Sequence, residues 1–95
     1  MHLVLLRFGT HRDRAPQHMA GHKAWLQRGF DDGVFVFAGS LGGAQGGAVL
    51  AHREPIDALR ERIALDPFVA EAVVQAEILV IEPSRVDERL SFLQH

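Results

Sequence analysis

The order of short apolar segments along the chain is the feature that most constrains its fold. Segments rich in Val, Leu, Ile and Phe have the length of strands, and two longer segments have helical periodicity. The predicted strands cover residues 2–8, 34–38, 48–52 and 76–82, and the predicted helices cover about 13 or 15 to 32 and 55 to about 65. The order β-α-β-β-α-β is that of the ferredoxin-like split βαβ arrangement. Because crossovers are right-handed, we expect an α+β domain in which a four-stranded antiparallel sheet carries both helices on one face.

The ends of the first predicted helix follow from its proline and glycine, and its buried face follows from the spacing of its apolar residues. Pro16 lies in its first turn, where a missing N–H group costs nothing, and Gly33 stops it. Met19, Leu26 and Phe30 fall within about 40° of one another at 100° per residue. We therefore expect these three side chains to form the stripe that faces the core.

The predicted strands are apolar on both faces. In the last strand Leu79 and Ile81 point one way while Ile78 and Val80 point the other. The helices can cover only one face, and a large exposed apolar patch is unusual for a monomer. A second copy of the chain is the economical cover, so we predict a homodimer whose sheets face each other.

Charge and composition exclude several classes of protein. Ten Lys and Arg against twelve Asp and Glu exclude a strongly electropositive nucleic-acid binder. Without cysteine there are no disulfides, no Cys-ligated zinc or iron–sulfur cluster and no thiol catalysis. No apolar run approaches the roughly 18 residues of a membrane span, and the start MHLVLLRF resembles a strand rather than a signal peptide. We expect a cytoplasmic domain over residues 1–83, without nucleic-acid or membrane partners.

Residues 84–95 form a separate C-terminal tail. Val86, Leu90 and Leu93 have helical spacing, and charged residues lie between them. This pattern predicts a short amphipathic segment that docks on its own subunit or on a partner subunit.

The histidines of the first helix are the most informative polar residues. His18 and His22 are four residues apart and share one side of the helix with Trp25, at the edge of the predicted core stripe. A half-buried histidine at such an edge is suited to acid–base work. Two other interpretations stay open: a surface or hydrogen-bonded edge residue, and a metal ligand pair. No third ligand is identifiable, so we predict no metal.

Asp66 is the second candidate for chemistry. It lies at a helix break, between Leu65 and the pair Pro67-Phe68, after which one or two further helical turns are expected over residues 68–74. A carboxylate among apolar residues can orient an imidazole and fix its tautomer. It can equally serve as the N-cap of the next helical turns. The two roles are compatible if one oxygen caps and the other faces the histidine.

The glycine-rich stretch from Gly39 to Gly47 connects two predicted strands. It is followed by neither a Lys-Ser/Thr pair nor a helix N-terminus, so it is not a phosphate-binding loop. A mobile hairpin loop over a pocket is expected instead. Arg7 interrupts an apolar strand and either binds an anionic substrate group or points to solvent from an edge strand.

Several motifs together resemble the YciI-like family of the dimeric α/β-barrel superfamily. They cover about residues 1–85, and only their combination is specific. The matching residues are His22-Lys23-Ala24-Trp25-Leu26, Asp32-Gly33, Ala38-Gly39, Gly46-Gly47-Ala48-Val49-Leu50-Ala51, Asp66-Pro67-Phe68-Val69 and Glu77-Ile78-Leu79-Val80-Ile81-Glu82-Pro83. The chain departs from the pattern at Ser40, where many members have proline, and at Met19, where many have arginine.

The resemblance implies a ferredoxin-like fold that dimerises through its sheets, with His22 and Asp66 meeting in a pocket as a catalytic dyad. It also implies eliminations or isomerisations of small cyclic or aromatic compounds, without a cofactor. The leading hypothesis is therefore a lyase- or isomerase-type enzyme in which His22 is the general acid or base. Arg7, Ser40 and Trp25 are the candidate substrate contacts. The alternatives are a non-catalytic dimer that binds a metabolite in the same pocket, and a purely structural accessory dimer.

Overall fold

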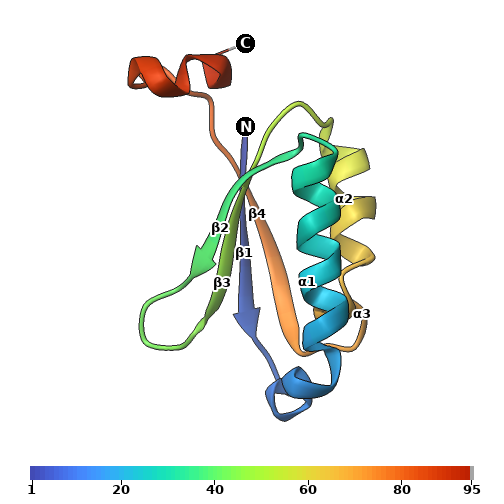
Figure 1. Ribbon diagram of the computed structural model, residues 1–95. Helices are drawn as coiled ribbons and strands as arrows, with labels where there is room; N and C mark the ends of the chain where they lie inside the picture. The colour runs from blue at the N-terminus through green and yellow to red at the C-terminus, as the bar shows by residue number, and fades with distance from the viewer. Residues whose placement is uncertain (95) are drawn as a thin grey trace.

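The computed structural model describes residues 1–94 as one antiparallel sheet with helices packed on one face (Figure 1). The strand order is β2-β3-β1-β4, which confirms the predicted ferredoxin-like α+β fold. The elements are β1 (His2–Phe8), the 3-10 turn η1 (Arg12–Arg14), α1 (Ala15–Asp31), β2 (Phe35–Ser40), β3 (Gly46–Ala51), α2 (Ile56–Ala64), α3 (Pro67–Ala70), β4 (Val74–Val80) and the 3-10 segment η2 (Glu88–Gln94).

The hairpin between β2 and β3 is tighter than the sequence predicts. Ser40 pairs with Gly47, so both strands continue into the glycine-rich stretch and only residues 41–45 form the connection. Gly46 has a φ of +133°, and a Cβ atom there would lie 2.0 Å from the carbonyl oxygen of Leu6 on β1. This glycine therefore permits close approach of two strands, a role that glycine also has in strands.

The buried face of α1 overlaps the predicted stripe only at Leu26, which packs against the core. Trp25 and Gly29 are the buried residues of this helix, whereas Met19 and Phe30 are each 39% exposed. The reason is the contact between Gly29 and Phe35 of β2, where a Cβ atom would lie 2.1 Å from the ring. Because Gly29 has no side chain, its face of α1 approaches the sheet more closely than a face of bulky residues can. This is therefore the face that packs on the sheet.

The hydrophobic core lies between the sheet and the helices. Buried apolar residues from every strand and from α1, α2 and α3 form one cluster. Its members are Val4, Leu6, Trp25, Val34, Phe35, Val49, Ala51, Leu59, Ile63, Phe68, Val73 and Val74. Because this cluster includes Phe68 and Trp25, the core also fixes the elements that carry the predicted site.

The other face of the sheet is free of helices (Figure 1). Since Val4 and Leu6 point into the core, their neighbours Leu3, Leu5 and Arg7 point to this open face. Leu50 and Leu79 pair with Leu3 and share its face, and Phe37 pairs with Leu50. The open face thus has an apolar part, as the two-sided strands predicted, and a polar part formed by Arg7, Gln75 and Glu77, of which Arg7 and Glu77 form an ion pair.

The tail leaves the sheet at the end where β1 begins (Figure 1). Within it Leu93 is buried, Leu90 is exposed, and Phe92 packs edge-on against His52 after β3, with 5.4 Å between ring centroids. His95, the last residue of the predicted tail, lies outside the described residues. Among residues 1–94, no helix combines the length and apolarity needed to cross a membrane.

Candidate active site

A direct contact joins the two residues expected to carry chemistry. Nδ1 of His22, on α1, lies 2.9 Å from Oδ1 of Asp66, at the start of α3. The side chain of His22 is 14% exposed and that of Asp66 is fully buried. An ionised carboxylate has no proton to give, so Nδ1–H donates and Asp66 accepts. This assignment leaves Nε2 as the ring nitrogen that is free to exchange a proton.

Aromatic rings hold the imidazole of His22 in place. It stacks on Phe68 with 4.1 Å between centroids and 4° between planes, and it stacks more loosely on Trp25 at 5.8 Å. Trp25 is in turn fixed, because its indole Nε1 donates to the carbonyl oxygen of Arg62 at 2.8 Å. The ring therefore has both a fixed hydrogen-bond partner and a fixed plane.

Arg62 ties the end of α2 to the surrounding loops. Its guanidinium donates to both carboxylate oxygens of Glu54 and to Asp32 after α1. The hydrogen bond to Glu54, followed by that to Asp32, raises the pKa of Arg62 against the opposing effect of burial. This clamp joins α1 to α2 behind Trp25, on the side away from the cavity described below.

Asp66 also caps α3, through the same oxygen that contacts His22. The backbone N–H of Phe68 donates to Oδ1 at 3.0 Å, which is the N-cap interaction. The two roles are thus compatible through one shared oxygen, and they do not require one oxygen each. The backbone of Asp66 points its side chain so that Oδ1 reaches both donors, while Oδ2 is buried without a hydrogen-bond partner among the described residues.

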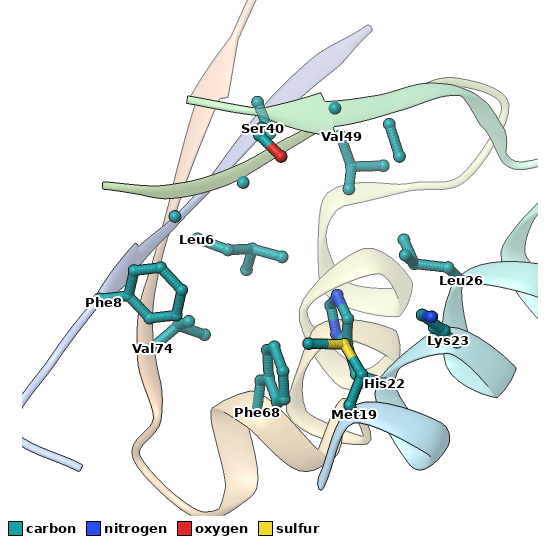
Figure 2. Close-up of a pocket in the computed structure, with 15 residues that line it drawn as sticks. Leu6, Phe8, Met19, His22, Lys23, Leu26, Ser40, Val49, Phe68 and Val74 are labelled. Atoms are coloured by element: carbon teal, nitrogen blue, oxygen red, sulfur yellow. The ribbon is translucent and has the colours of Figure 1, made fainter. Parts of the chain in front are cut away.

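A cavity of about 330 Å³ opens beside His22, between α1 and the ends of the strands (Figure 2). Its volume lies at the small end of the roughly 300–1,000 Å³ range of ligand sites. The wall is mainly apolar, and its polar side chains are His22, Lys23 and Ser40. The lining residues are Leu6, Phe8, Met19, His22, Lys23, Leu26, Ala38, Gly39, Ser40, Gly46, Gly47, Ala48, Val49, Phe68 and Val74.

The three residues predicted to contact substrate, Ser40, Trp25 and Arg7, lie in different parts of the structure. Ser40 lines the cavity opposite His22 (Figure 2). Trp25 is buried behind the imidazole and does not line the cavity. Arg7 lies on the open face of the sheet, paired with Glu77, on a central strand rather than an edge strand. The structure thus brings His22, Asp66 and Ser40 to one region and leaves Arg7 outside it.

The glycine-rich segment contributes through its strands and not as a loop over the pocket. Residues 38–40 of β2 and 46–48 of β3 line the cavity, whereas the connection 41–45 does not. His18 also does not line it, although it lies one turn before His22. Within residues 1–94, no group of three or more His, Cys, Asp or Glu residues is arranged to hold a metal ion.

Sequence reasoning missed three lining residues of α1 and β1. Met19 was assigned to the core, Phe8 to the sheet, and Lys23 was given no role. Phe8 has the guanidinium of Arg12 stacked 4.3 Å from its ring centroid. The position of Lys23 immediately after the candidate histidine was the one available signal for it.

Comparisons with known proteins support the fold. No known family model matches the chain, and no curated protein matches it. Among solved structures, the fold is similar to that of 5-chloro-2-hydroxyhydroquinone dehydrochlorinase (TftG) from Burkholderia phenoliruptrix AC1100, in complex with 2,5-dihydroxybenzoquinone. The TM-score is 0.69 at 15% sequence identity, over 85% of this chain and 93% of that chain. At this identity the likeness shows a shared fold.

Proposed function

We propose that the chain is a cofactor-independent enzyme that performs acid–base chemistry, an elimination or an isomerisation, on a small cyclic or aromatic compound. The observation that carries the proposal is the contact between His22 and the buried Asp66 at the wall of an apolar cavity. A positioned imidazole whose other nitrogen is held by a carboxylate is a recurrent general base.

In this proposal His22 moves the proton and Asp66 positions it. Nε2 takes a proton from a carbon or a hydroxyl group of the bound ring, and the electron pair of the broken bond forms a new C=C or C=O double bond. In an isomerisation the pair of the existing double bond moves to another carbon and takes the proton back from the imidazolium there, and in an elimination a leaving group departs with its bonding pair while the imidazolium later gives its proton to water. Asp66 stabilises the imidazolium, because its carboxylate is 2.9 Å from Nδ1.

Two further observations support this assignment. The burial of Oδ2 of Asp66 without a partner among the described residues is costly for a carboxylate that serves only as a helix cap. The structural neighbour acts on a substituted hydroquinone and binds a quinone, which are single rings. The resemblance to the YciI-like family points to the same pair of residues.

The experiment compares turnover in the intact protein and its variants. Chloride release from 5-chloro-2-hydroxyhydroquinone tests elimination, and migration of the double bond in a cyclohexenone tests isomerisation, both followed by NMR. His22→Ala and Asp66→Asn should each lower the rate by roughly 10²–10⁴-fold, the usual contribution of a positioned acid or base. Asparagine still offers an oxygen to Phe68, so the cap of α3 is retained.

His18→Ala is the matched control, since His18 is on the same helix and does not line the cavity. Its rate should equal that of the unmodified chain. Turnover that survives His22→Ala contradicts the proposal. Saturable binding of ring compounds with no turnover of any of them favours the alternative, a dimer that only binds a metabolite.

The assembly is part of the same proposal. We infer that two copies pair through their open sheet faces and that the protein works in the cytoplasm. The support for the pairing is the apolar open face, on which Phe37 is 50% exposed and Leu79 is 39% exposed. The cavity lies on the other side of the sheet, between β-strand ends and α1, so pairing leaves it open to ligand.

A further inference from the structure

One charged residue at the cavity has no role in the chemistry proposed above. Of the described lining residues, His22 is already paired with Asp66 and Ser40 is uncharged, so Lys23 is the permanent cation. Lys23 lies next to His22 on α1, and both residues line the same wall of the cavity (Figure 2).

Lys23 has no ionic partner among the described residues. No carboxylate lies within 4.0 Å of its amino group, whereas Arg7, Arg62 and the exposed Arg89 all form ion pairs. The residues one turn away on α1 are Met19, Ala20, Leu26 and Gln27, and none of them is charged. Lys23 is an exposed residue at the rim of the apolar cavity, so its ammonium is free to pair with the anionic group of a bound ligand.

The wall of the cavity formed by the hairpin suits a flat ligand. It is built from small residues on β2 and β3, including Ala38, Gly39, Gly46 and Gly47. A methyl group has no room at Gly46, where a Cβ atom would lie 2.0 Å from the carbonyl oxygen of Leu6, and it would be tight at Gly47, where a Cβ atom would lie 3.2 Å from the carbonyl oxygen of Gly39. Backbone therefore forms this wall. The volume of about 330 Å³ has room for one substituted ring.

We propose that Lys23 is the specificity-determining residue of this cavity, and that the ligand is a small planar ring bearing one negatively charged oxygen, a carboxylate or an ionised hydroxyl. The proposal deepens the proposed function, since it names the substrate class of the same site. Lys23 and His22 both line the cavity, so one ring can place its charged oxygen at the ammonium and a carbon near the imidazole. Lys23 then binds the charge and His22 moves the proton.

Binding of matched ring pairs tests the charge preference without requiring turnover. Benzoate is compared with benzamide by calorimetry. A nitrophenolate is compared with the corresponding nitroanisole through quenching of Trp25, the one tryptophan of the chain, whose ring is 5.8 Å from that of His22. The unmodified protein should bind at least one anion about tenfold more tightly than its neutral partner, as expected for one charge-assisted hydrogen bond.

Substitutions in the intact chain then show which residue causes the preference for the anion over its neutral partner. Lys23→Met should bring each anion to within about twofold of its neutral partner, and Lys23→Arg should keep most of the preference. Arg28→Met is the matched control: Arg28 is on the same helix and does not line the cavity, so its loss should leave the preference unchanged. Preference for benzoate alone identifies a carboxylate ligand, and preference for the nitrophenolate alone identifies an ionised hydroxyl.

The outcomes separate this proposal from the proposed function. His22→Ala should keep the preference for the anion even where turnover is lost. If the enzyme assays fail while the preference depends on Lys23, the cavity is an anion-binding site of a non-catalytic protein. Equal binding of charged and neutral rings by the unmodified chain, absence of binding by any of the four, or a preference that survives Lys23→Met would overturn the proposal.

Discussion

At the scale of single residues, two buried side-chain atoms within residues 1–94 have no hydrogen-bond partner. Oδ1 of Asp66 accepts from both His22 and the backbone of Phe68, while Oδ2 has no partner among the described residues. The other such atom is Nδ1 of His2, on the first strand. A buried polar atom without a partner costs stability. For Asp66 the proposed proton transfer accounts for that cost, and for His2 the consequence is a dependence of stability on pH.

His2 should make the protein less stable as the solution becomes acidic. Burial, followed by repulsion from the amino group of Met1, lowers the pKa of His2 from its usual value of 6.5. Below pH 6.5 the unfolded chain therefore binds a proton that the folded chain still rejects, so acidification favours unfolding down to the lowered pKa. His2→Gln removes this term. We expect the urea midpoint of the variant to fall less between pH 7.5 and pH 5 than that of the unmodified chain.

Both proteins contain the other histidines, so these contribute equally to the pH dependence of stability in each. The difference between the two proteins therefore reports on His2 alone. His11→Gln provides the control for removing any histidine, since His11 lies in the turn after β1. Equal losses of stability in the unmodified chain and in His2→Gln would show that His2 does not carry the effect.

At the scale of elements, the packing of α1 on β2 depends on one glycine. The ring of Phe35 lies where a side chain at position 29 would be, and the same ring packs edge-on against Trp25, with 5.1 Å between centroids. Because Trp25 also stacks on His22, the fit between α1 and β2 extends to the site.

Gly29→Ala should destabilise the protein by about 2 kcal/mol. Alanine favours a helix over glycine by up to about 1 kcal/mol, but overpacking a core costs about 1–3 kcal/mol and more when a ring has no space to move. Urea unfolding measures the difference. Phe35→Leu makes room at the same place, so the double variant should be more stable than the sum of the two single effects. A stabilising Gly29→Ala, or strict additivity, would contradict the packing described here.

The same contact explains which parts of the fold the sequence could predict. Strand order and helix placement follow from apolar periodicity and from Pro16, Gly33 and Pro67, all local signals. The face that α1 buries depends on the match between Gly29 and a ring six residues further along, which periodicity does not report. The extended hairpin was missed for a similar reason, since Gly46 is required by Leu6 on another strand.

The residues of the candidate site also divide into those that the sequence could predict and those that it could not. His22 and Asp66 were predicted because each lies at the border of an apolar segment, and the fold brings them into contact. The position of Arg7 on the opposite face follows from strand alternation combined with knowledge of which face the helices cover. Lys23 was missed because a lysine on a helix is ordinarily a solvent-exposed residue, and only the cavity gives it a role.

At the scale of the whole molecule, the open sheet face is covered by none of α1, α2 and α3, and on it Leu5 and Leu50 are buried while Phe37 and Leu79 are exposed. The apolar residues on it come from all four strands, so the surface is continuous across the sheet. Stable interfaces bury about 800 Å² on each partner, and the exposed face of a four-stranded sheet can supply such an area. The Arg7–Glu77 pair neutralises its own charge, which lowers the cost of enclosing it between two sheets.

A charge on the apolar part of this surface should therefore dissociate the proposed dimer. Phe37→Glu and Leu79→Glu each place an unpaired carboxylate where two apolar faces would meet, and an unpaired buried charge is strongly unfavourable. Light scattering at micromolar concentration should give twice the 10.5 kDa chain mass for the unmodified protein and the single chain mass for both variants. Leu65→Glu is the control, because Leu65 is 71% exposed at the end of α2 on the helical side.

The cavity is lined by other residues than those substituted on the open face. The effect of a variant on the dimer and its effect on ligand binding can therefore be measured separately. The lining of the cavity comes from α1, α3 and strand residues on the helical side, and neither Phe37 nor Leu79 contributes to it. If the dissociated variants keep the anion preference that depends on Lys23, the site is complete within one chain and the dimer serves stability. If they lose it while staying folded by circular dichroism, pairing of the sheets holds the strand ends that form the cavity wall. A single chain mass for the unmodified protein would contradict the proposed assembly, and would require the apolar face to be stable in water.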